Sequence, residues 1–365
     1  MSHEVLEVML PFLAETYANP SSIHSQGRIA RNAVNLAREQ VADLVNAHPT
    51  QVIFTSGGTE ANNAAIKGTL RGMAIGAVAC SAIEHPSVRD VVKGFEGVVS
   101  RSDISVDALG RISKTELTNI CQRESSLLVS MMLANNEAGT IQDIAELTKI
   151  GRSFGHYVHT DAVQAAGKMP VDFKQLGVHL MTLSAHKMYG PKGAGALIYD
   201  KSIDLEPIVH GGGQEKNLRS GTENVAAIVG FGKAAEIAKS NLERNYQYLS
   251  SLQQYFEDKL KQMPDIVLFA SDANRLVNTE FFSVPGVHGE ALLMQLDKSG
   301  VAVTSGSACA SKSEKPSHVL MAMGIDEQVA KNAIRVSFGL QNTKTEIDQF
   351  FSILQAQLSA LGIAS

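Results

Sequence analysis

The sequence has few cysteines, no long apolar run and no cluster of positive charge, and each shortage excludes a class of protein. Its three cysteines, Cys80, Cys121 and Cys309, form no CxxC pair and no disulfide framework, which indicates a reducing compartment and thiol chemistry for any cysteine that has a role. The longest near-apolar stretch, residues 72–83, is far shorter than the ~20 residues that span a bilayer. Lysine and arginine are scattered and the net charge is -5, which argues against a nucleic-acid partner. We therefore expect no membrane and no nucleic-acid partner, but a small molecule or another protein.

The start of the chain and its length set the remaining bounds. Met1-Ser2-His3-Glu4 is not a basic segment followed by an apolar run, so no secretory signal is visible and we expect a cytoplasmic protein. A chain of 365 residues exceeds the usual size of a single core, which predicts two domains. Hydrophobic residues at 44% and charged residues at 19% are ordinary for a globular protein.

Short apolar runs alternate with helical periodicity through most of the chain. An amphipathic helix is predicted over 28–47, and the segments that follow read as strands at 52–55, 77–82, 127–133, 157–160, 179–183 and 194–199, with helices at 60–70, 85–95 and 144–154 among them. This alternation is typical of an α/β fold with a mostly parallel central sheet and helices on both faces. Beyond one or two long helices over 227–261 the order is less regular. We therefore predict a large domain over 12–261 and a smaller α+β domain over 262–365, with residues 1–11 packing on the smaller one.

Chemically capable side chains gather where the predicted strands end. They are Thr59, His85, Asn136, Asp161 and the run Ser184-Ala185-His186-Lys187. Because the carboxyl ends of parallel strands form the ligand crevice of an open sheet, we expect these residues to form one site.

Three of these features together point to a cofactor. The turn 55–60 is rich in Gly, Ser and Thr and leads into a helix, which suits a phosphate, although alone it reads as a tight turn capped by Thr59. Asp161 alone reads as a helix cap, and Lys187 alone as a surface charge. In combination, an acid that protonates a ring nitrogen and a lysine 26 residues later that forms a Schiff base suit pyridoxal 5'-phosphate.

Other candidates depend on this context. His85 at a helix start is placed to stack on such a ring and to transfer a proton. Asn136 alone reads as a turn residue, and Arg335 in an apolar strand needs either a substrate carboxylate or a structural acid. Cys309 lies in a Gly/Ser-rich loop with no apolar core around it and is the best nucleophile of the chain, whereas Cys80 and Cys121 read as buried and inert.

Two other classes of function were weighed. Gly151-Arg152-Ser153-Phe154-Gly155 fits GxSxG and residues 210–213 resemble a lipase oxyanion loop, but a helix precedes Ser153 where a nucleophile elbow requires a strand. The order of the two motifs is reversed as well. A non-catalytic binding protein is expected to have lost Lys187 or Cys309, and both are present.

Six motifs together, spread in order over nearly the whole chain, resemble the cysteine desulfurases of the NifS/IscS type, in the class V aminotransferase group. The motifs lie at 54–63, 135–137, 159–164, 184–193, 211–222 and 305–309. The Ser-Gly-Ser-Ala-Cys sequence ending at Cys309 is similar to the long-loop members, whose cysteine passes sulfur to a scaffold or acceptor protein.

The resemblance implies a fold-type I enzyme that uses pyridoxal 5'-phosphate as a homodimer. Such an enzyme converts L-cysteine to L-alanine and leaves a persulfide that serves iron–sulfur cluster or other thio-cofactor synthesis. The resemblance assigns catalysis to Lys187, which holds the cofactor, to Cys309, which attacks the substrate sulfur, and to His85, which stacks on the ring. It assigns cofactor contacts to Gly58, Thr59, Asn136, Asp161, Gln164, Ser184, His186 and, from the other subunit, Thr222. Substrate contacts fall to Asn136 and Arg335, and no metal site is expected.

Two alternatives stay within the same group. One is a related enzyme such as a selenocysteine lyase. The other is a catalytically weakened paralogue, because the family pattern places a strand and an Asn-Ala-Thr-Thr-like segment on the substrate side of the site, ahead of the part that matches Glu4-Val5-Leu6-Glu7.

Overall fold

The computed structural model describes residues 1–263, 265–305 and 316–360 and divides the chain into two compact units. The large unit comprises Met1–Ile104, Lys114–Leu133 and Asp143–Leu242, and the small unit comprises Ser105–Ser113, Ala134–Gln142 and Glu243–Ser365. The division at 242/243 differs from the expected one at 261/262, and two earlier loops join the small unit. Helix α1 (His3–Ala14) lies in the large unit rather than on the small one, because it packs against α9 (Val225–Ser240).

The large unit contains a seven-stranded sheet in the order β1-β7-β6-β5-β4-β2-β3 among its described residues. The strands are β1 (Val52–Thr55), β2 (Ala77–Ser81), β3 (Ser100–Ile104), β4 (Leu127–Ser130), β5 (Tyr157–Asp161), β6 (Leu180–Ser184) and β7 (Gly195–Tyr199). Only β7 runs antiparallel to its neighbours, so the other six share one direction and their carboxyl ends lie at one edge. The predicted α/β class with a mostly parallel sheet is confirmed.

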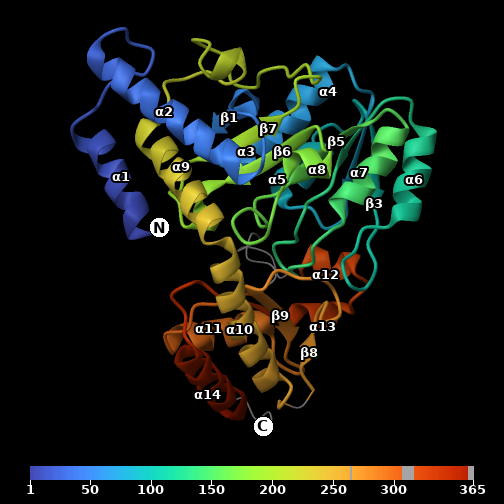
Figure 1. The fold of residues 1–365 in the computed structure, drawn as a ribbon. Helices are drawn as coiled ribbons and strands as arrows, with labels where there is room; N and C mark the ends of the chain where they lie inside the picture. Colours follow the sequence, from blue (N-terminus) through green and yellow to red (C-terminus); the bar gives the residue numbers. More distant parts are fainter. Residues whose placement is uncertain (264, 306–315, 361–365) are drawn as a thin grey trace. The chain divides into compact units, whose positions relative to one another are not determined.

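Helices cover the sheet and connect its strands. Besides α1 and α9 they are α2 (Ser25–Leu44), η1 (Pro49–Gln51), α3 (Gly58–Asn63), η2 (Ala64–Gly68), α4 (Thr69–Gly72), α5 (Pro86–Lys93), α6 (Lys114–Arg123), α7 (Ile144–Ser153), α8 (Phe173–Leu176), η3 (Ala185–Met188) and η4 (Glu215–Asn217). Apolar side chains of α3, η2 and α5 pack with Ile53, Leu128 and Leu197 of the sheet. Helices α2 and α9 lie side by side (Figure 1).

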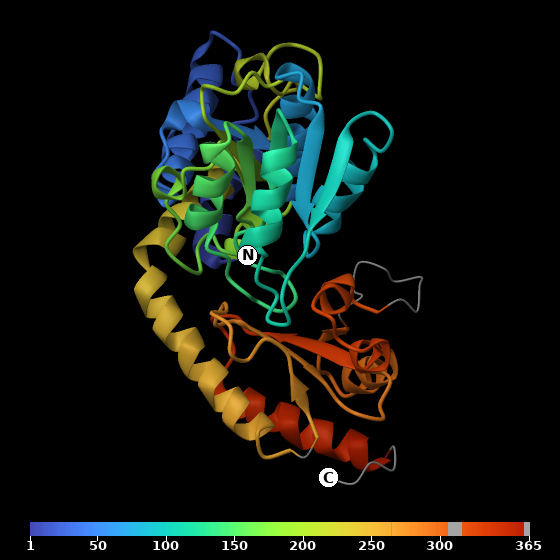
Figure 2. The ribbon, with the colours of Figure 1, turned by 90° about the vertical axis from the view of Figure 1, so that its right-hand side faces the viewer.

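The small unit contains a four-stranded antiparallel sheet in the order β10-β11-β9-β8. Its strands are β8 (Val267–Leu268), β9 (Thr279–Ser283), β10 (Thr304–Ser305) and β11 (Ala333–Ser337), and its helices are α10 (Leu242–Leu260), α11 (Gly289–Lys298), α12 (His318–Ala322), α13 (Glu327–Lys331) and α14 (Lys344–Ala360). Phe256 of α10 packs against Phe350 and Phe351 of α14, with ring centroids 5.4 and 4.9 Å away. Figure 2 shows α14 lying along this sheet with α10 beside it.

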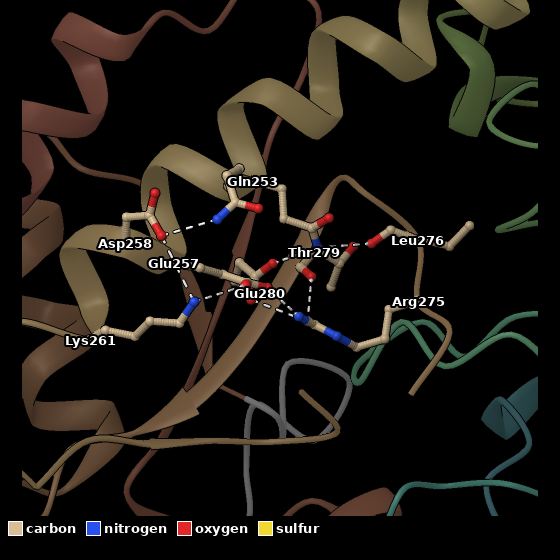
Figure 3. A network of polar contacts seen from close by, with 9 residues as sticks. Gln253, Glu257, Asp258, Lys261, Arg275, Leu276, Thr279 and Glu280 are labelled. Atoms are coloured by element: carbon tan, nitrogen blue, oxygen red, sulfur yellow. Dashed lines mark hydrogen bonds and ion pairs between the residues drawn. The ribbon is translucent and has the colours of Figure 1, made fainter. Parts of the chain in front are cut away.

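A buried ionic network fastens α10 to β9 within the small unit (Figure 3). The Arg275 guanidinium donates to both Glu257 and Glu280, and Gln253 donates to Glu280 at 2.7 Å. Burial raises the pKa of Glu280, although Arg275 opposes the shift. Removal of Arg275 therefore leaves a buried acid without its cation, which is strongly destabilising.

Two findings bear on the classes weighed from the sequence. Ser153 lies in the last turn of α7 and donates to the carbonyl of Ile150 at 2.8 Å, so it is not the elbow of an esterase. No helix in the described part of the chain combines the length and the apolar character needed to cross a membrane.

Candidate functional site

The large unit brings most of the predicted residues to the carboxyl edge of its sheet. Asp161 is the last residue of β5, His85 caps α5 after β2, and Lys187 lies in η3 directly after β6. Ser184 ends β6. Since β5 and β6 are paired neighbours, Asp161 and the Lys187 turn lie on adjacent strands.

Asp161 is a buried carboxylate held by neutral donors. Its side chain accepts hydrogen bonds from the Asn62 amide at 2.8 Å and from the Val163 backbone N–H at 2.9 Å. Burial raises the pKa of Asp161, while these donors and the nearby His85 oppose the shift. A carboxylate with this burial is stabilised most by a cationic N–H group placed against it.

Asn62 and Ser87 extend this contact to His85, and sequence reasoning missed both. The Asn62 amide donates to Asp161 and, at 2.8 Å, to Ser87 Oγ, which lies 2.7 Å from His85 Nδ1. Asn62 is one helical turn after Gly58 in α3, so its position on the face toward the strand ends was the available signal.

The contacts of His85 fix its neutral tautomer. The backbone N–H of Ser87 donates to His85 Nδ1 at 3.1 Å, and a backbone N–H can only donate. Nδ1 is therefore an acceptor, and the proton of the neutral ring is on Nε2. Burial lowers the pKa of His85, the charge of Lys187 lowers it further, and Asp161 opposes them.

The turn that carries Lys187 is a region of positive potential. His186 Nδ1 lies 2.8 Å from Ser184 Oγ. Desolvation lowers the pKa of His186, and the charges of Lys187, Lys168 and Lys192 lower it further. This convergence of lysines favours an anion at the end of β6.

The glycine-rich turn before α3 packs closely on the neighbouring strand ends. A Cβ on Gly58 would lie 3.0 Å from Val163 Cγ2 and 3.6 Å from Ser184 Cβ, and one on Gly195 would lie 2.5 Å from the carbonyl carbon of Gly57. Only residues without a side chain allow this approach. Thr59, the next residue, is exposed.

The loop that contains Thr222 is fastened to α3 by an ion pair. Arg219 Nε lies 2.8 Å from Glu60 Oε1. Burial alone would raise the pKa of Glu60, but hydrogen bonds from Arg219 and Ser56 outweigh it and lower the pKa. Thr222 itself is exposed.

Gln164 lies three residues beyond Asp161 and is half-buried. Its side-chain oxygen accepts a hydrogen bond from Lys168 Nζ at 3.0 Å. Lys168 was not among the predicted site residues.

Asn136 and Arg335 belong to the small unit. Arg335 Nη1, on β11, donates to the backbone carbonyl of Asn136 at 2.7 Å. Within the described residues, Asn136 Oδ1 is buried without a hydrogen-bond partner. A buried amide oxygen of this kind is stabilised by a donor on a ligand.

The three cysteines separate clearly. Cys309 lies outside the described residues. Burial raises the pKa of Cys80 to about 12, with Glu84 and Asp103 adding to the shift, and burial raises that of Cys121 to about 11. Neither buried thiol supplies a thiolate at neutral pH.

A cavity of about 850 Å³ opens beside His85. Thr59, Asn63, Lys67 and Ser87 are among its lining residues. In the described parts of the chain no three His, Cys, Asp or Glu side chains come together as a metal site. The large unit therefore offers a ligand a carboxylate at one end, a cluster of cations at the other and a histidine N–H between strands.

Comparison with known proteins agrees with this geometry. The family model described as aminotransferase class-V matches residues 1–350. A curated relative, "Cysteine desulfurase IscS" of Dictyoglomus turgidum, is 42% identical over 98% of this chain and 92% of its own length. The solved NifS-like protein from Rickettsia africae is 35% identical, with a TM-score of 0.91 over 98% of this chain and 96% of that one. A structure titled "SspA in complex with cysteine" is 32% identical, with a TM-score of 0.81 over 93% and 95%.

Proposed function

Because this chain belongs to the class-V aminotransferase family, in its branch of IscS-type cysteine desulfurases, we propose that it is a pyridoxal-phosphate-dependent enzyme that takes sulfur from L-cysteine. The observation that carries the proposal is the pairing of a buried Asp161 with the lysine-rich turn at 186–187 on the adjacent strand. The relative solved with cysteine supports the choice of substrate.

The residues present fit pyridoxal 5'-phosphate. Asp161 suits the protonated pyridine nitrogen, Lys187 suits covalent attachment, and His186 with its neighbouring lysines suits the phosphate. Gly58, Thr59 and Ser184 complete the phosphate side in our proposal. When bound, the cofactor supplies an electron sink for the electron pair released at the substrate carbon.

The chain's own residues then have separate tasks. Asn136 and Arg335 bind the substrate, Arg335 through the carboxylate. His85 presents Nε2–H toward the ring and acts as a hydrogen-bond or proton donor. This differs from the sequence-based expectation that His85 accepts the proton of Cys309, because a neutral ring with Nδ1 as acceptor has no lone pair free on Nε2.

Cys309 is the proposed sulfur acceptor. Its thiolate attacks the substrate sulfur, an S–S bond forms, and the C–S bond of the substrate breaks. The released electron pair and a proton end on the former β-carbon, which becomes the methyl group of L-alanine. Cysteine and the enzyme thiol thus give alanine and an enzyme persulfide, with no external oxidant or reductant.

Three finer parts of the proposal concern partners and place. We propose a homodimer in which Thr222 serves the other subunit's phosphate site, since Thr222 is exposed on a loop anchored by Arg219 and Glu60. The persulfide passes to an acceptor or iron–sulfur scaffold protein in the cytoplasm. Sedimentation should give twice the chain mass, and a monomer that binds the cofactor tightly would contradict the shared site.

The central experiment follows both products and the position of the sulfur. The purified protein should be yellow, and borohydride should fix the chromophore to the peptide that contains Lys187. With L-cysteine it should release alanine and carry extra mass of one sulfur on Cys309. Cys309→Ser should keep the colour and lose alanine production, whereas the control Cys121→Ser should retain both. A colourless protein that the cofactor does not reconstitute, or sulfur on Cys80 or Cys121, would refute the assignment.

A further inference from the structure

Gln164 and Lys168 are brought together by a tight turn after β5. Backbone hydrogen bonds from Lys168 and Met169 to the Ala165 carbonyl close the turn at 3.0 and 3.1 Å. Gly167 within it has φ +77°, and a Cβ there would lie 3.1 Å from both Ala238 and Met188. The backbone therefore fixes the point from which the Lys168 side chain departs.

The Lys168 ammonium determines which way the Gln164 amide faces. Nζ donates to the backbone carbonyl of Gln164 at 2.9 Å and to its side-chain Oε1 at 3.0 Å. An ammonium group has three donors and no acceptor, so only the amide oxygen can face it. The amide of a glutamine without such a neighbour has two nearly equivalent orientations, related by a flip. Here the NH₂ group is directed away from Lys168.

We propose that Lys168 is a positioning residue that presents Gln164 as a hydrogen-bond donor to the phenolic oxygen of the bound pyridoxal ring. This inference rests on the proposed function. The ring oxygen is an acceptor, and a flipped Gln164 amide would place a second acceptor against it. Lys168 also polarises the amide, because a donor whose carbonyl oxygen binds a cation is a stronger donor.

The surrounding charges set the sign of the expected effect. Lys168 lies in the same field as Lys187 and Lys192, since all three lower the pKa of His186, while Asp161 and His85 lie on the neighbouring strand ends. Loss of Lys168 removes a cation and an oriented donor, and both losses make it easier for the bound chromophore to take up a proton. The midpoint of its absorbance titration should therefore move to higher pH.

The test is a pH titration of the visible absorbance of the holoenzyme without substrate. Lys168→Met should raise the midpoint by about half a unit or more, which is about threefold in proton affinity. Lys168→Arg, which keeps the donors and the charge, should stay close to the native midpoint. Lys174→Met is the matched control, because Lys174 is exposed and bonds only Asn46 at 3.3 Å among its printed side-chain contacts.

A double-mutant cycle separates relay through Gln164 from the charge alone. In a Gln164→Leu background, Lys168→Met should shift the midpoint by less than half as much as in the native background. An equal shift in both backgrounds, or no shift in either, would overturn the inference. If Lys168→Met does not fold, as judged by circular dichroism, Gln164→Glu keeps the test decisive: it retains Lys168, offers no donor and should also raise the midpoint. A wild-type protein that fails to bind the cofactor would instead refute the proposed function.

Discussion

Glu84 is a fully buried acid beneath the site, and its replacement by glutamine should alter the pH dependence of stability. Its Oε1 accepts hydrogen bonds from Ser81 Oγ at 2.5 Å and from the Met132 backbone N–H at 2.6 Å, so it links the ends of β2 and β4. Burial raises the pKa of Glu84 from 4.5 to about 8, the two hydrogen bonds oppose the shift, and the Asp161 charge adds to it.

The raised pKa means that the folded protein holds a proton that the unfolded chain has released. Between pH 4.5 and about 8 the native state binds more protons, so the free energy of unfolding falls as pH rises through this range. The full shift corresponds to at most about 5 kcal/mol. Glu84→Gln removes the titration. It should cost about 1–2 kcal/mol at pH 5, where both side chains are neutral, and should be more stable than the native protein at pH 9.

Urea unfolding of both proteins at pH 5, 7 and 9 measures this difference. The stability difference between variant and native protein should change sign as pH rises. Glu39→Gln, which alters an exposed carboxylate on α2, should leave the pH profile unchanged. A Glu84→Gln protein that is destabilised equally at pH 5 and pH 9 would refute the reasoning.

Three further substitutions test other parts of the structure. Asp161→Asn should weaken cofactor binding about 10- to 100-fold in equilibrium titration, because a charged hydrogen bond of ~1.5–3 kcal/mol is lost; unchanged affinity would contradict its role. Gly195→Ala should destabilise by about 2 kcal/mol in thermal unfolding, because its Cβ would overlap the Gly57 backbone, whereas Gly76→Ala, which meets nothing within 4 Å, should not. Ser317→Ala removes a buried hydroxyl that donates to Glu137 and should cost ~1.5–3 kcal/mol of small-unit stability by urea unfolding; a loss under 0.5 kcal/mol would count against that contact.

The strand-end residues were predictable because hydrophobic runs locate buried strands and a parallel sheet aligns their ends. Asp161, His85 and Lys187 follow such runs directly, and the structure has them at one edge of one sheet. Strand β3 was missed because it is a mostly exposed edge strand with the sequence Ser-Arg-Ser-Asp-Ile, which has no apolar run to mark it.

Tertiary partners were not predictable from local pattern. Asn62 reads as an ordinary polar residue in a helix until the structure places Asp161 and Ser87 beside it. The loops at 105–113 and 134–142 follow strands of the large unit but belong to the small one, held there by contacts such as Ile141 N–H to the Asn274 carbonyl at 2.8 Å. Only long-range pairing assigns such segments, and hydrophobic periodicity carries no record of it.

The charge arrangement of the large unit restricts which ligand the site accepts. Adjacent strands lie about 4.8 Å apart, so the Asp161 carboxylate at the end of β5 and the cations after β6 are separated by roughly the scale of one small ring. A ligand with a cationic N–H at one end and an anion at the other matches both, whereas a ligand of reversed polarity meets a buried carboxylate with its anion. The unphosphorylated ring keeps the first match and loses the second. The lysines around His186 therefore favour the phosphorylated cofactor, while Asp161 selects the protonated state of its ring.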